Sequence, residues 1–249
     1  MEKHEFTRIK HETVRRMLKV VSKEFITPRM LRIVFHSDEL QGFHSPSVDD
    51  HIKIFFPGDN ASEPVMRDFT PRAWDLESGT ITLDFALHPE GPAVEWARDA
   101  EIGAALQMGG PRGSTVVPDD FDWYLLIGDA TGLPSIGRRL ETLRKDVSVY
   151  VLALIEDEDE KQEFSTSTSC QIHWVETDHK LQRDAESLLA AVKQLKLPPG
   201  DGFIWIAAEV LIARELYRYA VDTLNHPKHW VKAAGYWSVG NTDETERIV

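Results

Sequence analysis

Apolar and polar positions alternate through much of the first half of the chain. Residues 52–56 place Ile52, Ile54 and Phe56 on one side of an extended chain, which is the pattern of a half-buried strand. Residues 81–87 repeat this pattern. Other apolar runs predict strands over 14–25, 30–36 and 104–108. Short strands separated by turn residues predict an antiparallel β-barrel or sandwich.

The pattern changes beyond Pro118. Continuous apolar runs now alternate with segments of helical spacing, which is typical of βαβ units and a parallel sheet. The predicted strands are 123–127, 147–155, 171–175, 203–208 and 230–234, and the predicted helices are 133–145, 185–196 and 210–224. We therefore predict a β-barrel domain over 10–118, followed over 119–249 by a Rossmann-like α/β domain with a C-terminal extension.

Composition narrows the class of function. The net charge of −13 argues against a general nucleic-acid binder and against docking on anionic lipid, because both reward clustered cations. The single cysteine, Cys170, excludes an internal disulfide and a cysteine-held iron–sulfur cluster on this chain. The first residues lack the apolar core of a signal peptide, and no stretch is long enough to span a bilayer. We therefore expect a cytoplasmic protein.

Residues 66–74 combine a cation, an aromatic ring and a hydroxyl on one predicted strand. Arg67 and Phe69 share a face because strand side chains alternate, and Thr70 follows at the adjoining edge. A flat redox ring with a pyrophosphate tail needs a stacking surface, a hydrogen-bond partner and a guanidinium group. An ordinary strand with a solvated arginine and a core phenylalanine fits these residues as well.

Two glycine-containing segments predict places where backbone approaches a ligand. Gly91 precedes Pro92, a sequence that suits the start of a helix. Free backbone N–H groups at that end, together with the helix dipole, favour a phosphate. Residues 110–114 form a second such place. Each segment by itself fits a simple loop equally well.

Two further segments bear on cofactors and metals. Residues 128–135 place small residues and a hydroxyl after a buried strand, where open α/β sheets bind ligands. The Gly-x-Gly-x-x-Gly fingerprint of dinucleotide sites is missing from that turn. The acidic run 156–160 lacks the ligand spacing and glycine of a calcium loop. We expect a solvated loop there and no metal site.

Taken in chain order, these features resemble the ferredoxin–NADP reductase superfamily. More narrowly, they resemble the siderophore-interacting protein family of ferric-siderophore reductases. The matching motifs are residues 67–72, 84–88, 91–93 with 96–97, 110–114, 128–135 and 234–240. The resemblance runs from about residue 15 to residue 241, and the motifs at 128–135 and 234–240 are the most specific.

The resemblance implies FAD held noncovalently between the two domains. Arg67 would bind the pyrophosphate, Phe69 would pack on the isoalloxazine or its ribityl arm, and Thr70, the residue we name as catalytic, would hydrogen-bond at flavin N5. Thr131 would face the flavin from the second domain, near where nicotinamide enters. The residues assigned to FAD are Arg67, Asp68, Phe69, Thr70, His88, Gly91, Pro92, Ala93, Ser114, Thr131 and Trp237, and Tyr236 would close the site together with Trp237.

The implied reaction carries electrons from a reduced donor to the flavin and then singly to Fe(III) in a siderophore. Iron is then released in the cytoplasm, because Fe(II) is held less strongly by the oxygen ligands of the chelate. Two alternatives stay open. One is a general flavin reductase or ferredoxin–NADP reductase, and the other is a non-catalytic siderophore-binding protein.

The substrate and the donor are less well defined. Many family members carry a basic residue where this chain has Ser238, so Lys53 is the candidate for chelate binding and Arg247 a remote second. Fewer cations favour neutral or cationic hydroxamate complexes over anionic catecholates. The donor is NADH, NADPH or a separate ferredoxin. One predicted helix carries four cations that would dock a ferredoxin, bind a 2′-phosphate or form a solvated surface. They are Arg138, Arg139, Arg144 and Lys145.

Overall fold

The structure of this chain is a computed structural model that describes residues 4–58, 63–87, 91–177, 184–239 and 246–248. The chain divides into two compact units, which comprise residues 4–118 and residues 119–249. No helix within the described ranges is long and apolar enough to cross a membrane.

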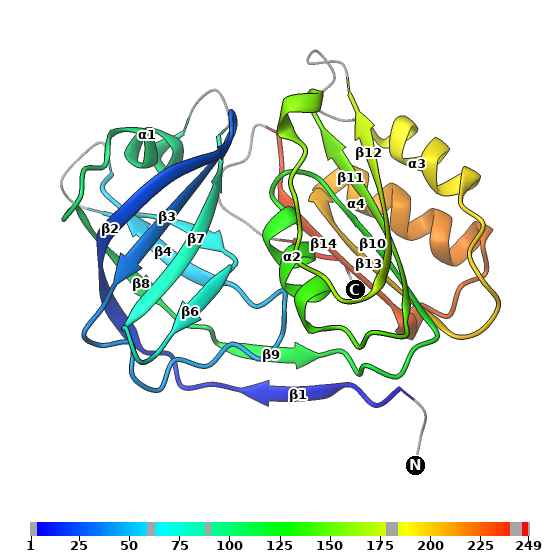
Figure 1. Cartoon of the computed structure of the whole chain (residues 1–249), viewed down its shortest axis with the longest axis horizontal. Coiled ribbons are helices and arrows are strands. Elements are labelled where there is room, and N and C mark those ends of the chain that lie inside the picture. Colours follow the sequence, from blue (N-terminus) through cyan, green and yellow to red (C-terminus); the bar gives the residue numbers. More distant parts are fainter. Residues whose placement is uncertain (1–3, 59–62, 88–90, 178–183, 240–245, 249) are drawn as a thin grey trace. The chain divides into compact units, whose positions relative to one another are not determined.

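The first unit is a curled antiparallel sheet with one short helix. Its seven strands lie in the order β5-β4-β8-β2-β3-β7-β6 and form a half-barrel (Figure 1), and β1 pairs separately with β9. This confirms the predicted antiparallel barrel. The bounds are β1 Thr7–Lys10, β2 Arg15–Thr27, β3 Met30–His36, β4 Ile52–Phe56, β5 Val65–Phe69, β6 Ala73–Asp75, β7 Thr80–Ala86, α1 Pro92–Asp99, β8 Ala105–Gly109 and β9 Gly113–Val116.

One-sided burial of the strands builds the core of the half-barrel. Ile52, Ile54 and Phe56 of β4 are completely buried, and Leu83 and Phe85 of β7 lie in the same apolar cluster. The alternation that predicted these strands therefore also identified the residues that face inward, because side chains two apart on a strand share a face.

The two edge strands of this sheet follow each other directly along the chain. β5 ends at Phe69 and β6 begins at Ala73, so residues 70–72 cross from one edge of the sheet to the other. The Phe69 and Phe85 ring centroids lie 4.5 Å apart, and the Arg72 backbone N–H donates to the Thr82 carbonyl at 2.9 Å. These contacts hold the open side of the half-barrel together at the end of β5.

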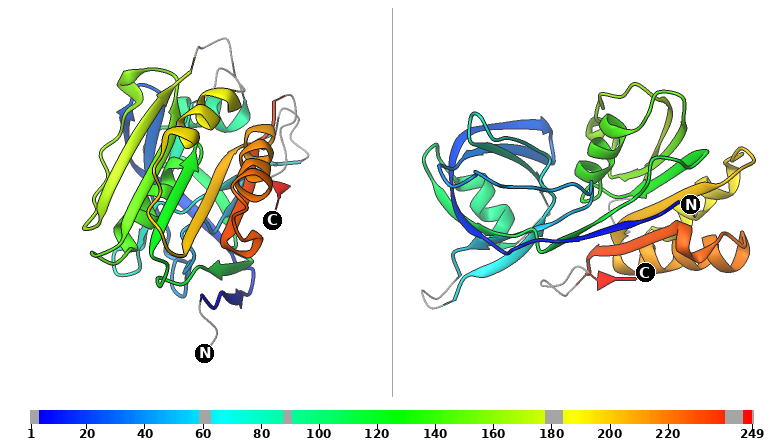
Figure 2. Two further views of the ribbon diagram at one scale, coloured as in Figure 1. Left: turned by 90° about the vertical axis from the view of Figure 1, so that its right-hand side faces the viewer. Right: turned by 90° about the horizontal axis from the view of Figure 1, so that it is seen from below.

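The second unit is a six-stranded sheet in the order β12-β11-β10-β13-β14-β15, parallel except for β15. Figures 1 and 2 show α2 on one face of the sheet and α3 with α4 on the other, so the predicted α/β fold is confirmed. The bounds are β10 Trp123–Gly128, α2 Leu133–Thr142, β11 Ser148–Ile155, η1 Glu158–Glu160, β12 Ser169–Glu176, α3 Ala185–Gln194, β13 Gly202–Glu209, α4 Val210–Arg218, η2 Tyr219–Thr223, η3 Lys228–Trp230, β14 Val231–Trp237 and β15 Glu246–Arg247.

The strand order reverses between β10 and β13. The chain adds β11 and β12 on one side of β10, then returns to add β13 and β14 on the other side. Side chains at Gly128 and Gly132 would place Cβ only 2.9 and 2.6 Å from the Ala207 carbonyl oxygen, so these glycines let the β10–α2 turn lie against β13. This reversal is the switch point at which open α/β sheets bind ligands.

Short elements were the ones that sequence reasoning missed. β1, β6, β9 and β15 contain between two and four residues, too few to show a period. The predicted helix 133–145 was also too long. It ends at Thr142 because Leu143 is extended, with φ −71° and ψ 146°.

Candidate functional site

Strand β5 presents its predicted site residues on two different faces. Arg67 lies opposite Ile54 and Phe69 opposite Ile52, so both belong to the side that packs on the core. Phe69 packs against the half-barrel core and stays partly exposed. The Arg67 guanidinium donates to the Met66 carbonyl at 2.8 Å. The predicted shared face of Arg67 and Phe69 is confirmed.

Asp68 points to the opposite face from Arg67. It lies opposite Lys53 of β4, whose ammonium donates to the Asp68 carboxylate at 2.9 Å. The structure therefore separates the Asp68 side chain from the other β5 residues assigned to FAD. The Asp68 carboxylate also compensates the positive charge of Lys53, the residue that we named for chelate binding.

Thr70 sits where the chain leaves β5 to cross to β6. The residue is 8% exposed. The chain is anchored on both sides of it, because the Phe69 ring packs against Phe85 in the core and the Arg72 amide donates to the Thr82 carbonyl of β7. On the outer face, the Arg32 guanidinium binds Asp84 at 2.7 and 2.8 Å, and Arg72 Nε lies 3.9 Å from the same carboxylate. These contacts limit the movement of the crossing segment and hence of Thr70.

The start of α1 has the properties that a phosphate needs. Gly91 precedes the helix with φ 138° and ψ 150°, and none of the described side chains caps it. The first bond within the helix runs from Glu95 N–H to the Gly91 carbonyl, so the amides of Ala93 and Val94 have no partner inside the helix. Among the described residues, no atom lies within 4 Å of a Cβ added at Gly91. His88 lies outside the described residues.

Ser114 belongs to a buried hydrogen-bond network. Its hydroxyl donates to Asp50 at 2.7 Å and lies 2.7 Å from His11 Nε2. Asp50 also accepts from the Ser45 hydroxyl at 3.1 Å and from the Ser47 amide at 3.1 Å. Burial raises the pKa of the Asp50 carboxyl. The network joins β9 to the segment that precedes β4, which gives Ser114 a structural task beside its predicted contact with FAD.

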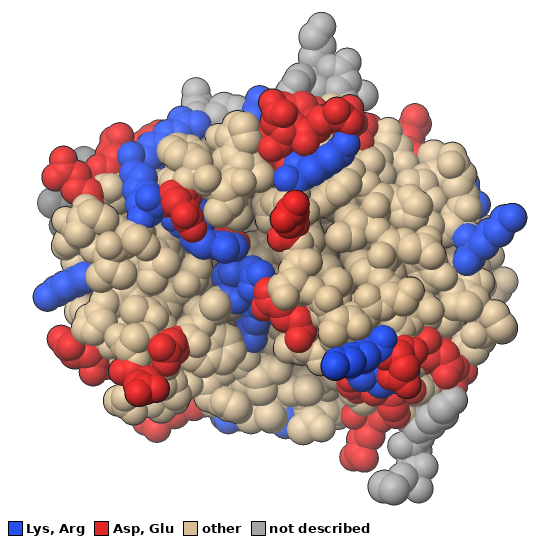
Figure 3. Space-filling model, viewed as in Figure 1, with Lys and Arg blue, Asp and Glu red and all other residues tan. Residues whose placement is uncertain are grey.

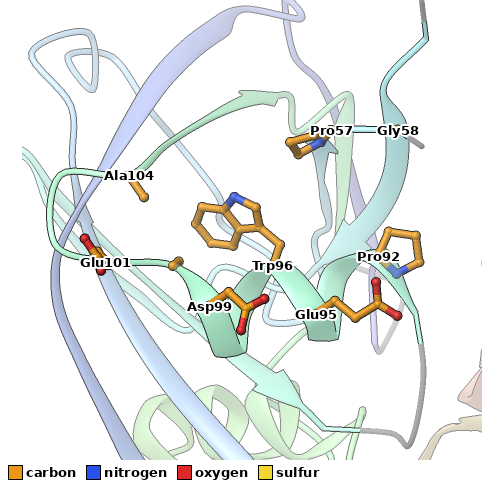
Figure 4. Close-up of a pocket in the computed structure, with 9 residues that line it drawn as sticks. Pro57, Gly58, Pro92, Glu95, Trp96, Asp99, Glu101 and Ala104 are labelled. Atoms are coloured by element: carbon orange, nitrogen blue, oxygen red, sulfur yellow. The ribbon is translucent and has the colours of Figure 1, made fainter. Parts of the chain in front are cut away.

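Charge on the half-barrel is mixed. Figure 3 shows cationic side chains in a band over β2, β3 and β7, interrupted by acidic ones. Three carboxylates border a recess of about 490 Å³, which lies beside α1 and has Trp96 at its centre (Figure 4). They belong to Glu95, Asp99 and Glu101. An acidic border repels phosphates and anionic chelates, so this recess does not extend the proposed phosphate site.

In the second unit, Asp129 connects three segments at the carboxyl ends of the strands. The residue is 7% exposed. Its Oδ1 accepts from the Thr131 amide at 2.9 Å and from the Thr131 hydroxyl at 2.5 Å. Its Oδ2 accepts from the Glu209 amide and from Trp237 Nε1, both at 2.8 Å. The structure thus brings the predicted residues Thr131 and Trp237 together around a carboxylate to which sequence reasoning gave no role.

Glu209 was missed as well. Its buried carboxylate accepts from the Leu211 amide at 2.7 Å and the Ile212 amide at 3.4 Å, and so caps α4. It also accepts from the Val239 amide at 3.4 Å. An acidic residue at the carboxyl end of a buried parallel strand is the signal that Asp129 and Glu209 share, since Asp129 directly follows β10 and Glu209 is the last residue of β13.

The cations proposed for a ferredoxin or a 2′-phosphate do not share a helix face. Arg138 and Arg139 lie in α2 and are each 7% exposed. Arg144 follows the helix and is anchored to Asp119 at 3.1 Å and to the Phe121 carbonyl at 2.7 Å. The predicted helix ran to residue 145, three residues beyond the observed end of α2, and therefore placed all four cations on one helix.

Comparisons with known proteins match both units. A family model described as a siderophore-interacting protein covers residues 121–240, and one described as a siderophore-interacting FAD-binding domain covers 19–64 and 58–115. The chain is 33% identical to an NADPH-dependent ferric-chelate reductase of Escherichia coli, over 92% of this chain and 95% of that protein. It is 29% identical to the ferric vibriobactin reductase ViuB of Vibrio cholerae, over 92% and 91%.

A crystal structure of a siderophore utilization protein from T. fusca has the same fold. It superposes with a TM-score of 0.90 at 29% identity, covering 96% of this chain and 98% of that one. The likeness therefore spans both units, not only one of them.

Proposed function

This chain belongs to the siderophore-interacting protein family, and we propose that it is an FAD-dependent ferric-siderophore reductase that takes electrons from NADPH. The observation that carries the proposal is the start of α1, whose uncapped amides lie in a chain matched over 19–115 by a siderophore-interacting FAD-binding domain. The NADPH assignment rests on the name of the Escherichia coli relative. NADH and a separate ferredoxin are the other donors to be tested.

The groups of the first unit suit the pyrophosphate and the isoalloxazine ring of FAD. The Ala93 and Val94 amides and the positive end of the α1 dipole suit the pyrophosphate, and the Arg67 guanidinium adds a charge-assisted contact. Phe69 offers the exposed side of its ring for packing, and the Thr70 hydroxyl is proposed to hydrogen-bond at flavin N5. When bound, FAD accepts a hydride and releases electrons one at a time.

The residues of the chain have three tasks in this reaction. Arg67 and the start of α1 bind the phosphates, while the half-barrel core behind Phe69 keeps water from one side of the flavin. The short crossing at Thr70, held by the Arg72 amide, orients the hydroxyl with little motion. The protein need not coordinate iron, because reduction itself weakens the hold of the chelate on the metal.

The charge at Lys53 supports a substrate preference. Its ion pair with Asp68 leaves little positive potential for an anionic chelate. We therefore propose neutral or cationic hydroxamate complexes as better substrates than anionic catecholates. NADPH is a cytoplasmic reductant, so we propose that iron is released in that compartment.

Absorption spectroscopy of the purified protein tests this proposal first. We expect the two visible bands of bound flavin, which NADPH bleaches under anaerobic conditions and a ferric hydroxamate restores. A colourless protein that takes up no FAD would favour a non-catalytic siderophore-binding protein. A flavin that NADPH reduces but no ferric chelate reoxidises would favour a general flavin reductase.

A further inference from the structure

Two consecutive aromatic residues at the end of β14 reach the β10–α2 turn and the first turn of α2. The Tyr236 hydroxyl lies 3.2 Å from the Ser135 hydroxyl, and Trp237 Nε1 donates to Asp129 at 2.8 Å. Consecutive side chains of a regular strand point to opposite faces of the sheet. The end of β14 must therefore depart from regular strand geometry.

A register shift provides this departure. Ala208 of β13 lies opposite Gly235, but the next residue, Glu209, lies opposite Trp237. Tyr236 is thus an extra residue on β14, which is the arrangement of a β-bulge. Bulges re-aim side chains next to functional sites, and this one turns Trp237 toward Asp129.

The hydrogen bonds to Asp129 make the indole direction specific. Four N–H or O–H donors from Thr131, Glu209 and Trp237 share its two oxygens. Rotation of the carboxylate would break several of these bonds at once, so its acceptor lone pair for Trp237 is fixed in place. A carboxylate acceptor also makes the bond stronger than one between neutral groups.

Asp129 also limits what the start of α2 can bind. The Thr131 amide donates to the Asp129 side chain, the Gly132 amide donates to the Asp129 carbonyl at 2.9 Å, and Pro134 has no amide hydrogen. Dinucleotide folds place a pyrophosphate on amides in this position. Here the amides are largely used, and a carboxylate stands beside them. This edge of the sheet therefore suits a planar ring without negative charge better than a phosphate.

We propose that Asp129 is a positioning residue that fixes the Trp237 indole beside the switch point between β10 and β13, where the indole packs against the nicotinamide end of the donor. This inference rests on the proposed function, because it assumes a pyridine nucleotide donor. The nucleotide is held at this edge through its planar ring, and its phosphates bind elsewhere. A β10–α2 turn that holds no phosphate needs no glycine fingerprint, which agrees with the absence of that fingerprint after β10.

Binding measurements with two probes test the proposal. NADP⁺ carries the nicotinamide ring, and adenosine 2′,5′-bisphosphate lacks it. We expect Asp129→Asn and Trp237→Phe each to weaken NADP⁺ binding roughly tenfold, the worth of one hydrogen bond to a charged group, and to leave the bisphosphate unchanged. Trp230→Phe is the matched control, since Trp230 lies before the other end of the same strand and its loss should change neither probe.

Indole N–H signals in a two-dimensional NMR spectrum give a readout independent of activity. The chain has seven tryptophans, and the signal lost in Trp237→Phe identifies Trp237. Asp129→Asn should shift that signal upfield, and the double variant should bind NADP⁺ no more weakly than the weaker single variant. Additive losses, equal losses for both probes, or unchanged NADP⁺ binding in Trp237→Phe would overturn the proposal.

The outcome can be separated from that of the proposed function. Photoreduction of the flavin bypasses the nucleotide, so reoxidation by a ferric hydroxamate then tests the reductase activity alone. If Asp129→Asn does not fold, the comparison of Trp237→Phe with Trp230→Phe still decides the matter.

Discussion

Substituting Gly91 by alanine tests the phosphate site at α1 through backbone strain. A Cβ added there would meet no described atom within 4 Å, but φ 138° with ψ 150° is a conformation that alanine disfavours. Strain of this kind costs about 1–3 kcal/mol. Alanine will therefore shift the segment before Pro92 to another conformation, and FAD will have to restore the original one to reach the Ala93 and Val94 amides.

The strain should weaken the binding of FAD. One to three kcal/mol corresponds to roughly a 5- to 150-fold weaker affinity, measured by titrating FAD into apoprotein and following flavin fluorescence. Gly103→Ala is the matched control, because Gly103 also has positive φ, 90°, and no described atom within 4 Å of its Cβ position. Gly103→Ala should lower the melting temperature and leave FAD affinity unchanged. Equal FAD affinity in wild type, Gly91→Ala and Gly103→Ala would refute the assignment.

Three further substitutions give distinct outcomes. Arg67→Ala should weaken FAD binding about tenfold or more, because a charge-assisted contact contributes about 1.5–3 kcal/mol; unchanged affinity in the same titration would contradict this role. Asp68→Asn frees Lys53 from its ion pair, and should lower KM for an anionic tris-catecholate chelate but not for a neutral hydroxamate; equal changes for both would count against it. Burial lowers the pKa of His226, which hydrogen-bonds the Gly202 carbonyl. The unfolded chain therefore binds more protons below about pH 6.5, and the free energy of unfolding falls there; His226→Asn should flatten that dependence in thermal melts.

Local pattern predicted most of the fold and only part of the site. The alternation over 52–56 identified β4 and its buried face, and Gly91 with Pro92 identified the start of α1. Both features depend on neighbouring residues. The three-residue strand β6 left no periodic signal. It exists because the chain crosses between the two edges of a curled sheet.

Long-range contacts account for the part of the site that was missed. Trp237 reaches Asp129 across 108 positions of sequence, and Ser114 reaches Asp50 across 64. A β-bulge and a sheet reversal create the first contact, and neither has a pattern in the sequence. The predicted cationic helix face failed for a related reason: burial of Arg138 and Arg139 is decided by packing in the second unit.

Anaerobic titration of the reduced enzyme with a ferric hydroxamate tests the central claim most directly, namely that this chain passes electrons from bound FAD to chelated iron. The flavin is first photoreduced, and an Fe(II)-specific chelator reports the released metal. We predict that about two Fe(II) appear for each FAD reoxidised, because a two-electron flavin supplies single electrons to iron. A flavin that stays reduced while the ferric chelate remains intact would contradict the account.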